Sequence, residues 1–208
     1  MTLLPFLDYA SVFVFALTGA LVASRAQLDL VGFLFIAALT ALGGGTIRDL
    51  LLDRNPIFWM ADPTLLAVTA IAAGLVFLTA HLFESRLRVL TWLDAIALAI
   101  AVPAGVGLAL DMGQHWGVVL IMGIATGTFG GLMRDVLCNQ VPMVLQRELY
   151  ATVALFTGVF YVGMLWLEIN TTLATLAALG SGFLFRVLAM TFHWKLPDFN
   201  GKEIRGLD

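Results

Sequence analysis

Charged residues are scarce in this chain, and cysteine is nearly absent. Asp, Glu, Lys and Arg make up 12% of the 208 residues, about half the share of a soluble domain. Hydrophobic residues reach 61%, and the mean hydropathy is +0.97. A single cysteine, Cys138, excludes an intrachain disulfide. The composition therefore predicts an integral membrane protein, with membrane lipid as its immediate partner.

Signatures of other protein classes are missing as well. The net charge is −3 and Lys and Arg form no cluster, which argues against nucleic acid as a partner. Gly-x-Ser-x-Gly, His-Glu-x-x-His and P-loop patterns do not occur. His81, His115 and His193 are far apart and lack the spacing of metal ligands. We therefore expect no enzymatic activity, no cofactor and no metal site, and residues 1–7 lack the charged region of a cleavable signal peptide.

Apolar runs long enough to cross a membrane recur along the whole chain. Spanning helices need about 20 apolar residues, and tryptophans lie near the ends of the runs, as expected at a membrane interface. The sequence predicts seven spans, at about 5–24, 30–52, 64–82, 92–110, 116–138, 148–168 and 172–193. They form a single transmembrane domain of residues 1–195, followed by a short tail of residues 196–208.

The distribution of Lys and Arg predicts how the chain is oriented. With seven spans the two termini lie on opposite sides of the membrane. The side of the N-terminus carries Arg48 and Arg54, whereas the other side carries Arg25, Arg86, Arg88, Arg134, Arg147, Lys195, Lys202 and Arg205. Because Lys and Arg accumulate on the cytoplasmic side, we expect the N-terminus outside and the C-terminal tail in the cytoplasm.

An internal repeat organises the sequence. Residues 7–56 align without a gap to residues 93–142, and twelve of the fifty pairs are identical. The matches include polar residues that apolar composition does not explain: Asp8 with Asp94, Thr40 with Thr126, Gly44-Gly45 with Gly130-Gly131, and Arg48-Asp49 with Arg134-Asp135. Each copy holds three spans, so the second enters the membrane from the opposite side. The prediction is an inverted repeat, about 5–82 and 92–168, with a seventh helix at 172–193.

A glycine-rich stretch followed by a charge pair is the strongest motif of each copy. Consecutive glycines weaken a helix, so we expect the second and fifth spans to be interrupted or kinked there. The glycines are Gly43, Gly44, Gly45, Gly130 and Gly131, and the charges are Arg48, Asp49, Arg134 and Asp135. Irregular backbone at membrane depth lines a protein-covered or water-filled cavity. The motif therefore predicts two broken helices around a polar path, with the charges at its two ends.

Other interpretations of the same residues stay open at this point. The arginines could extend to the membrane interface, and the glycines could serve only the close approach of helices. Asp8 and Asp94 are expected to be structural carboxylates at helix starts, and Arg186 either an interface charge or the partner of a buried carboxylate. Four threonines are candidates for lining the path, although threonines in a span usually bond their own helix: Thr18, Thr40, Thr126 and Thr128.

The duplicated unit resembles the prokaryotic branch of the trimeric intracellular cation (TRIC) channels. The resemblance rests on the two glycine and Arg-Asp motifs and on the seventh span. It implies a homotrimer of the prokaryotic plasma membrane with one pore in each subunit. It also implies second and fifth helices that are kinked at the glycines and line the pore. The permeant ions would be monovalent cations, chiefly potassium, with sodium as a second candidate. Phe129 departs from the pattern, because the first copy has Gly43 at that position.

The motif is compatible with two activities. One is a potassium-permeable channel, and the other is a secondary transporter of a small neutral amino acid such as glycine, which the same family is thought to include. A channel needs a continuous wet path with weak sites, whereas a carrier needs an occluded site. A scaffold without transport activity leaves the duplicated charges unexplained.

Overall fold

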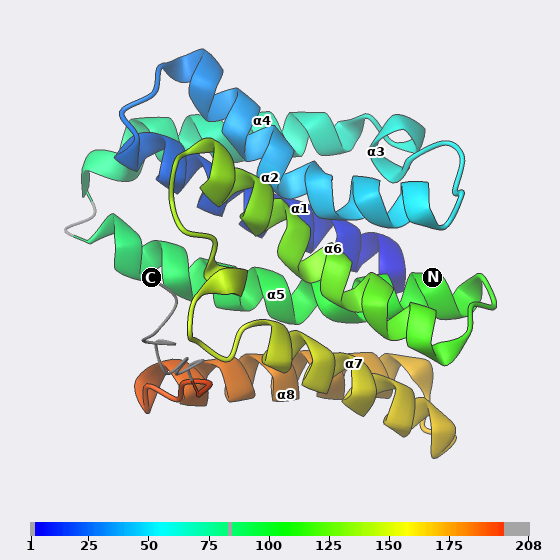
Figure 1. Ribbon diagram of the computed structural model, residues 1–208. Helices are drawn as coiled ribbons and strands as arrows, with labels where there is room; N and C mark the ends of the chain where they lie inside the picture. Colours follow the sequence, from blue (N-terminus) through cyan, green and yellow to red (C-terminus); the bar gives the residue numbers. More distant parts are fainter. Residues whose placement is uncertain (1–2, 83–84, 198–208) are drawn as a thin grey trace, which may run out of the picture.

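The computed structural model describes residues 3–82 and 85–197, and these residues form a bundle of helices (Figure 1). The long helices are α1 Leu3–Arg25, α2 Leu30–Leu51, α4 Thr64–Thr79, α5 Arg86–Asp111, α6 Trp116–Leu137, α7 Ala151–Trp166 and α8 Thr171–Thr191. Short helices lie in the connections: α3 Phe58–Ala61, η1 Ala80–Leu82 and η2 Met143–Leu145. Most of the predicted tail of residues 196–208 lies outside the described residues.

Length and composition allow six of these helices to cross a membrane. They are α1, α2, α4 together with η1, α5, α6 and α8. α7 is equally apolar but has only 16 residues. The chain between Leu137 and Ala151 forms η2 and turns, so α7 begins at Ala151 and not at about residue 148 as predicted. α5 begins at Arg86, six residues before the predicted span. The helical membrane-protein fold is confirmed, and the count of seven spans stays a prediction.

The repeat in the sequence is visible in the helix boundaries. Adding 86 to the bounds of α2, 30–51, yields the bounds of α6, 116–137. Both helices are followed by a residue with positive φ, Asp53 and Asn139, each at 53°. α3 and η2 occupy corresponding connections, and α4 and α7 follow them. The two copies therefore share the order of their elements as well as their motif.

Two apolar clusters form most of the core, one around each repeat; α5 contributes to both, and α8 joins the second. One cluster of buried residues includes Phe15, Ala37 and Ala72 from α1, α2 and α4. The other includes Val119 and Tyr161 and also takes residues from α5 and α8. Between the cores, α1 packs against α5 and α2 packs against α6. Figure 1 shows α5 crossing the middle of the molecule, with α7 and α8 along one edge. The centre of the bundle thus combines elements of both repeats.

The glycines lie where α2 and α6 pass each other. A Cβ atom at Gly44 would lie 2.3 Å from the carbonyl oxygen of Thr126, and one at Gly130 would lie 2.1 Å from that of Thr40. Only a residue without a side chain permits this approach, which is the usual role of small residues between membrane helices. The predicted interruption is wrong: both helices run unbroken through their glycines. Tertiary packing outweighs the weak helix propensity of glycine, and a bend in either helix stays a prediction.

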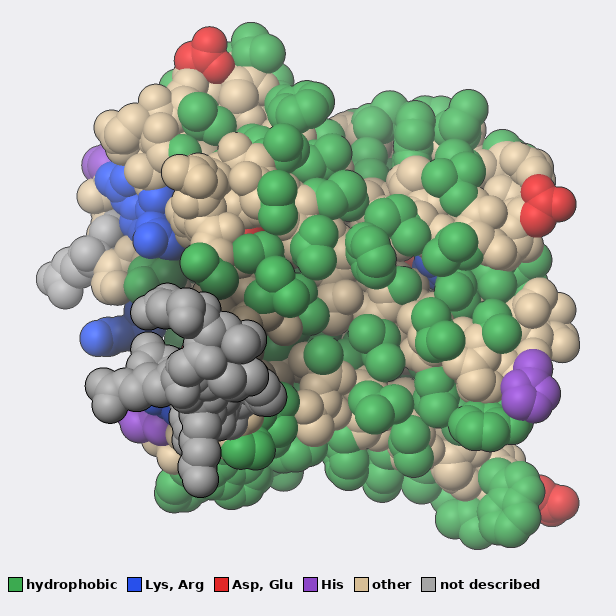
Figure 2. All heavy atoms as spheres, viewed as in Figure 1, with side chains coloured by type: hydrophobic (Ala, Val, Ile, Leu, Met, Phe, Trp, Pro, Cys, Tyr) green, Lys and Arg blue, Asp and Glu red, His purple; other side chains and the backbone are tan. Residues whose placement is uncertain are grey.

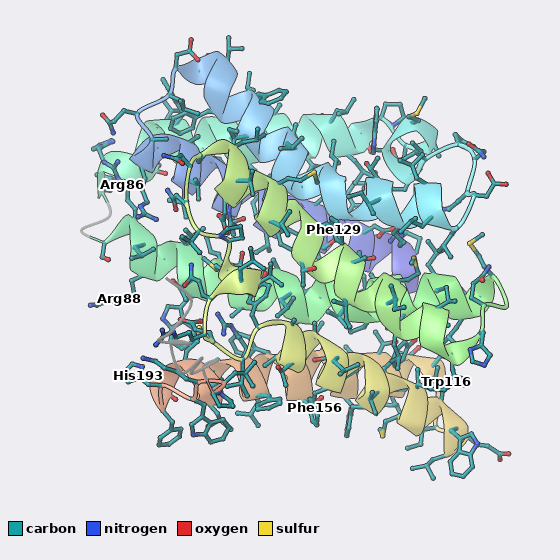
Figure 3. All side chains as sticks on the ribbon, in the orientation of Figure 1. Arg86, Arg88, Trp116, Phe129, Phe156 and His193 are labelled. Atoms are coloured by element: carbon teal, nitrogen blue, oxygen red, sulfur yellow. The ribbon has the colours of Figure 1, made fainter. Side chains whose placement is uncertain are left out.

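Charged side chains gather at the two ends of the molecule. On the face in Figure 2, hydrophobic side chains cover the middle, and Lys and Arg lie at the left-hand end. Arg86, Arg88 and His193 are at this end, and Trp116 is at the other (Figure 3). The helix axes run between the two ends, so the apolar middle corresponds to the hydrocarbon layer.

Candidate functional site

Arg48 is the centre of a buried ion cluster in the first repeat. Its residue is 1% exposed, so the side chain is enclosed by protein. Its Nε donates to Oδ1 of the neighbouring Asp49 at 2.8 Å, and its Nη1 donates to Oδ1 of Asp8 at 3.3 Å. The guanidinium also lies over the ring of Phe58, 5.3 Å from the centroid. α1 and α2 thus supply two carboxylates to one arginine.

Arg134 repeats this arrangement in the second copy with closer contacts. It is fully buried, its Nε donates to Oδ1 of Asp135 at 2.7 Å, and its Nη1 donates to Oδ1 of Asp94 at 3.0 Å. The same Nη1 also donates to the hydroxyl of Thr18 at 2.9 Å. Removing either partner of such a buried pair leaves an uncompensated charge and costs about 3–5 kcal/mol. Both clusters are therefore expected to be held firmly.

The second carboxylate oxygens of both motif aspartates bind the connections that follow their helices. Oδ2 of Asp49 accepts from the backbone N–H of Phe58 at 2.8 Å, and Oδ2 of Asp135 accepts from that of Met143 at 3.2 Å. Arg54 adds a half-buried contact to Asp49 at 3.4 Å. The Arg-Asp pair therefore has two roles: Asp neutralises the adjacent Arg and fixes the short helix after the span.

Both clusters leave polar atoms without a hydrogen-bond partner in the described structure. These atoms include Nη2 of Arg48 and Nη2 of Arg134. A buried polar group without a partner is costly, and such groups usually bind water or a ligand. Each guanidinium thus keeps the two N–H donors of Nη2 available for a water molecule or a bound solute.

Two cavities adjoin the clusters. The first, of about 10 Å³, has room for about one water molecule. The side chains around it include Asp8, Arg48, Thr40 and Thr126. The second is larger, about 160 Å³, and its lining includes Asp135, Gln140 and Glu148. Thr126 lines the smaller cavity and Asp135 lines the larger one, so α6 contributes to both.

The threonines predicted to line the path, and Phe129, lie in different surroundings. Thr40 and Thr126 line the small cavity and face the glycines of the opposite helix. Thr128 is buried and donates to the carbonyl of Ile124 in its own helix. Phe129 is 36% exposed and takes no part in the crossing of Gly44 and Gly130.

Other residues of the first repeat serve packing. Gly43 lies against the Cε of Met133, and Gly45 lies against the ring of Phe58. In the second repeat, Gly131 lies near Nη2 of Arg134 and Oδ1 of Asp94, where a side chain would intrude on the ion cluster.

Asp8 and Asp94 belong to the site, although a structural role at helix starts was expected for them. Asp94 lies two turns inside α5, and both aspartates are direct partners of the motif arginines. Their identity at the repeat offset was the signal that could have found them. Arg186 of α8 is also buried; its Nη2 donates to Glu148 at 2.6 Å, and its guanidinium lies over the ring of Tyr150.

Comparison with known proteins matches both repeats. A family model described as Glycine transporter covers residues 5–81 and 91–166. The UPF0126 inner membrane protein YadS of Escherichia coli K12 is 36% identical over 203 residues, which are 95% of this chain and 96% of the relative. A UPF0126 membrane protein of Vibrio cholerae is 38% identical over 202 residues, which are 95% of this chain and 83% of the relative.

A solved structure shows the same fold at similar sequence identity. The TRIC trimeric intracellular cation channel orthologue from Rhodobacter sphaeroides has a TM-score of 0.90 and 38% identity, covering 93% of this chain and 100% of that one. The chain belongs to the prokaryotic TRIC family. Membership of the TRIC family confirms the resemblance seen in the sequence. The chain is thus an integral membrane protein, and one of its relatives carries the name of an inner membrane protein.

Proposed function

We propose that this chain is a monovalent-cation channel, permeable to potassium, with one pore in each subunit of a homotrimer. The observation that carries the proposal is the pair of ion clusters related by the repeat, each beside a cavity within one subunit. The similarity to a trimeric intracellular cation channel supports both the ion and the assembly. The path would run between α1, α2, α5 and α6, from the Arg48 cluster to the Arg134 cluster.

The charge balance of each cluster favours a cation. Two carboxylates surround one guanidinium in both repeats, which leaves a formal charge of −1 at each end. A monovalent cation about 6 Å from such a charge gains about 3 kcal/mol at an effective dielectric constant of about 20. Arg54 partly offsets this gain at the Arg48 end, where it is half-exposed to solvent and therefore screened.

The arginines do not oppose cation passage, because the neighbouring carboxylates balance the positive charge of each guanidinium. Two of the three guanidinium nitrogens of Arg48 and of Arg134 donate to side-chain acceptors, and only Nη2 is without one. Each arginine therefore acts as a fixed counter-charge between two carboxylates. A weak site of this kind binds an ion without trapping it.

The placement of basic residues supports an orientation for the channel. Arg86 and Arg88 lie at the end of the molecule opposite Trp116 (Figure 3). Because α6 begins at Trp116 and ends at Leu137, Arg134 lies towards the end of Arg86 and Arg88. We place this end in the cytoplasm and the N-terminus outside the prokaryotic inner membrane. The Arg48 cluster then faces the outside and the Arg134 cluster faces the cytoplasm.

A carrier of small amino acids is the second candidate. The family description, Glycine transporter, favours it, and so do the buried Nη2 atoms, which have no partner among the described residues. An amino-acid carboxylate would bind such a donor strongly, since hydrogen bonds between charged groups are roughly twice as strong as neutral ones. The small cavity beside Arg48 has room for about one water molecule, so glycine would need a wider conformation.

A comparison of two fluxes on purified protein in lipid vesicles tests the proposal. The channel predicts potassium flux well above protein-free vesicles, non-saturating over the millimolar range, and no glycine counterflow. The carrier predicts saturable glycine exchange with potassium flux at background. Absence of potassium flux together with glycine exchange refutes the channel.

A further inference from the structure

The connections that follow α2 and α6 have the same backbone hydrogen bond but different side chains. The repeat pairs Arg54 with Gln140. The backbone N–H of Arg54 donates to the carbonyl oxygen of Asp49 at 2.8 Å, and that of Gln140 donates to the carbonyl oxygen of Asp135 at the same distance. The side chains of Arg54 and Gln140 therefore begin at equivalent places beside the two motif aspartates.

In the first repeat a guanidinium group occupies the space beside the motif aspartate. Nη1 of Arg54 donates to Oδ2 of Asp49 at 3.4 Å. The same oxygen also accepts from the backbone N–H of Phe58 at 2.8 Å. The side chain of Arg54 is 34% exposed, so the protein encloses it only partly. Asp49 thus shows that a carboxylate at this position of the repeat can face a planar cation.

Gln140 leaves the corresponding space open in the second repeat. Oδ2 of Asp135 accepts from the backbone N–H of Met143 at 3.2 Å, as Oδ2 of Asp49 does from Phe58. The cavity of about 160 Å³ lies here, and both Asp135 and Gln140 line it. The small cavity of about 10 Å³ has room for about one water molecule, so the larger one has room for an ion of the size of guanidinium.

Both charged side chains in the lining of the larger cavity are carboxylates, Asp135 and Glu148. Their arginine partners are buried and do not line the cavity. Nε of Arg134 donates to Oδ1 of Asp135 at 2.7 Å, and Nη2 of Arg186 donates to Oε2 of Glu148 at 2.6 Å. The cavity therefore presents two carboxylates from different connections to a solute.

The other polar groups of the lining are neutral. Thr91, Gln140 and Gln146 supply a hydroxyl and two amides. Arg25, at the end of α1, is exposed and lies outside the lining, and its Nη1 donates to Oε1 of Gln140 at 3.4 Å. Its positive charge is thus directed at an amide and not at a carboxylate of the cavity. These surroundings suit a cation that also donates hydrogen bonds.

We propose that the cavity beside Asp135 binds a small organic cation that carries a guanidinium group. The bound group takes the place that Arg54 has beside Asp49, and it donates to the carboxylates of Asp135 and Glu148. Guanidinium fits carboxylates better than a spherical cation does, because its N–H donors lie in one plane and pair with carboxylate oxygens. The binding is independent of transport. Only its consequence, block of potassium current from the Arg134 end, rests on the proposed function.

Saturation-transfer NMR with methylguanidinium tests the binding without ion flux. Purified protein in detergent should transfer saturation to the methyl protons of millimolar methylguanidinium, whereas tetramethylammonium, which has no N–H donor, should receive little. Gln140→Arg places a tethered guanidinium in the cavity, and the transfer should fall about fivefold, since the site is filled and carries a like charge. Leu82→Arg is the matched control. It adds the same charge four residues before Arg86, at an exposed position outside the lining, and should keep the transfer.

The exchange of the two side chains provides a second test. Arg54→Gln combined with Gln140→Arg moves the open space from Asp135 to Asp49 and should restore most of the transfer. If Gln140→Arg does not fold, Gln146→Arg fills the cavity from another exposed position of its lining. Full transfer in the variant with the filled cavity, or an equal signal from tetramethylammonium, refutes the site.

Potassium currents in planar bilayers test the position of the site on the path. Methylguanidinium should reduce the current when added at the Arg134 end and not at the Arg48 end, and after Arg54→Gln it should reduce the current from both ends. Saturation transfer without any potassium current refutes the channel and supports the site. Potassium current without saturation transfer refutes the site alone. Transfer together with an unblocked current refutes its position on the path.

Discussion

Alanine at Gly44 or Gly130 should force α2 and α6 apart. The added Cβ atoms would lie 2.3 Å and 2.1 Å from the carbonyl oxygens of Thr126 and Thr40, and ordinary contact begins at 3.4 Å. The neighbouring atom in each case is backbone, which cannot rotate away as a flexible side chain can. The helices must therefore separate by about 1 Å, and that separation removes packing contacts along the whole crossing.

The expected loss follows from two opposing terms. Overpacking a close contact costs about 1–3 kcal/mol, and alanine regains about 1 kcal/mol of helix propensity relative to glycine. We expect each variant to lose up to about 2 kcal/mol of stability, and to be about 1–3 kcal/mol less stable than a glycine-to-alanine variant that gains propensity without overpacking. The double variant should lose less than the sum, because both substitutions separate the same pair of helices. Potassium flux should fall as well, since the crossing lies beside the small cavity.

The assay is thermal unfolding of the purified protein in detergent, followed by potassium flux in vesicles. Gly74→Ala and Gly163→Ala are the matched controls, because a Cβ atom at either position has nothing within 4 Å. These two variants should be as stable as the unmodified protein or slightly more so. If Gly44→Ala and Gly130→Ala unfold at the same temperature as the controls, the crossing is not as tight as the distances indicate, and the argument fails.

Three further predictions concern charge, topology and assembly. Asp135→Asn should reduce the preference for cations over anions, measured as a shift of the reversal potential towards zero in a potassium chloride gradient; an unchanged potential would place Asp135 outside the ion path. A cysteine at exposed Lys195, with Cys138 replaced, should resist an impermeant thiol reagent in intact cells, whereas one at exposed Asn55 should react; the reverse pattern would invert the orientation. Native mass spectrometry should find three copies of the chain, and a monomer at all protein concentrations would contradict the trimer.

The sequence by itself was sufficient for the class of protein, for most helix positions and for the duplication. Scarce charge and long apolar runs predict membrane helices, since burying many charges in hydrocarbon is too costly. The constant offset between copies predicts that Arg48 and Arg134 have equivalent surroundings. It also pairs Asp8 with Asp94, although a structural role at helix starts was expected for both. These features are local or periodic, and so they can be found without coordinates.

Only the tertiary structure decided the roles of the motif glycines and of Asp8 and Asp94. Glycine propensity predicts a broken helix, but a helix whose glycines pack against a neighbour keeps its hydrogen bonds and uses the missing side chains for close approach. Helical periodicity shows which residues share a face, but not which helix covers that face. For this reason Asp8, Asp94 and Thr18 join the arginines only once α1, α2, α5 and α6 are placed together. Thr18 and Ala104 stand at matching positions of the repeat and differ by one side chain, and only the tertiary structure shows that Thr18 contacts Arg134 of the other repeat.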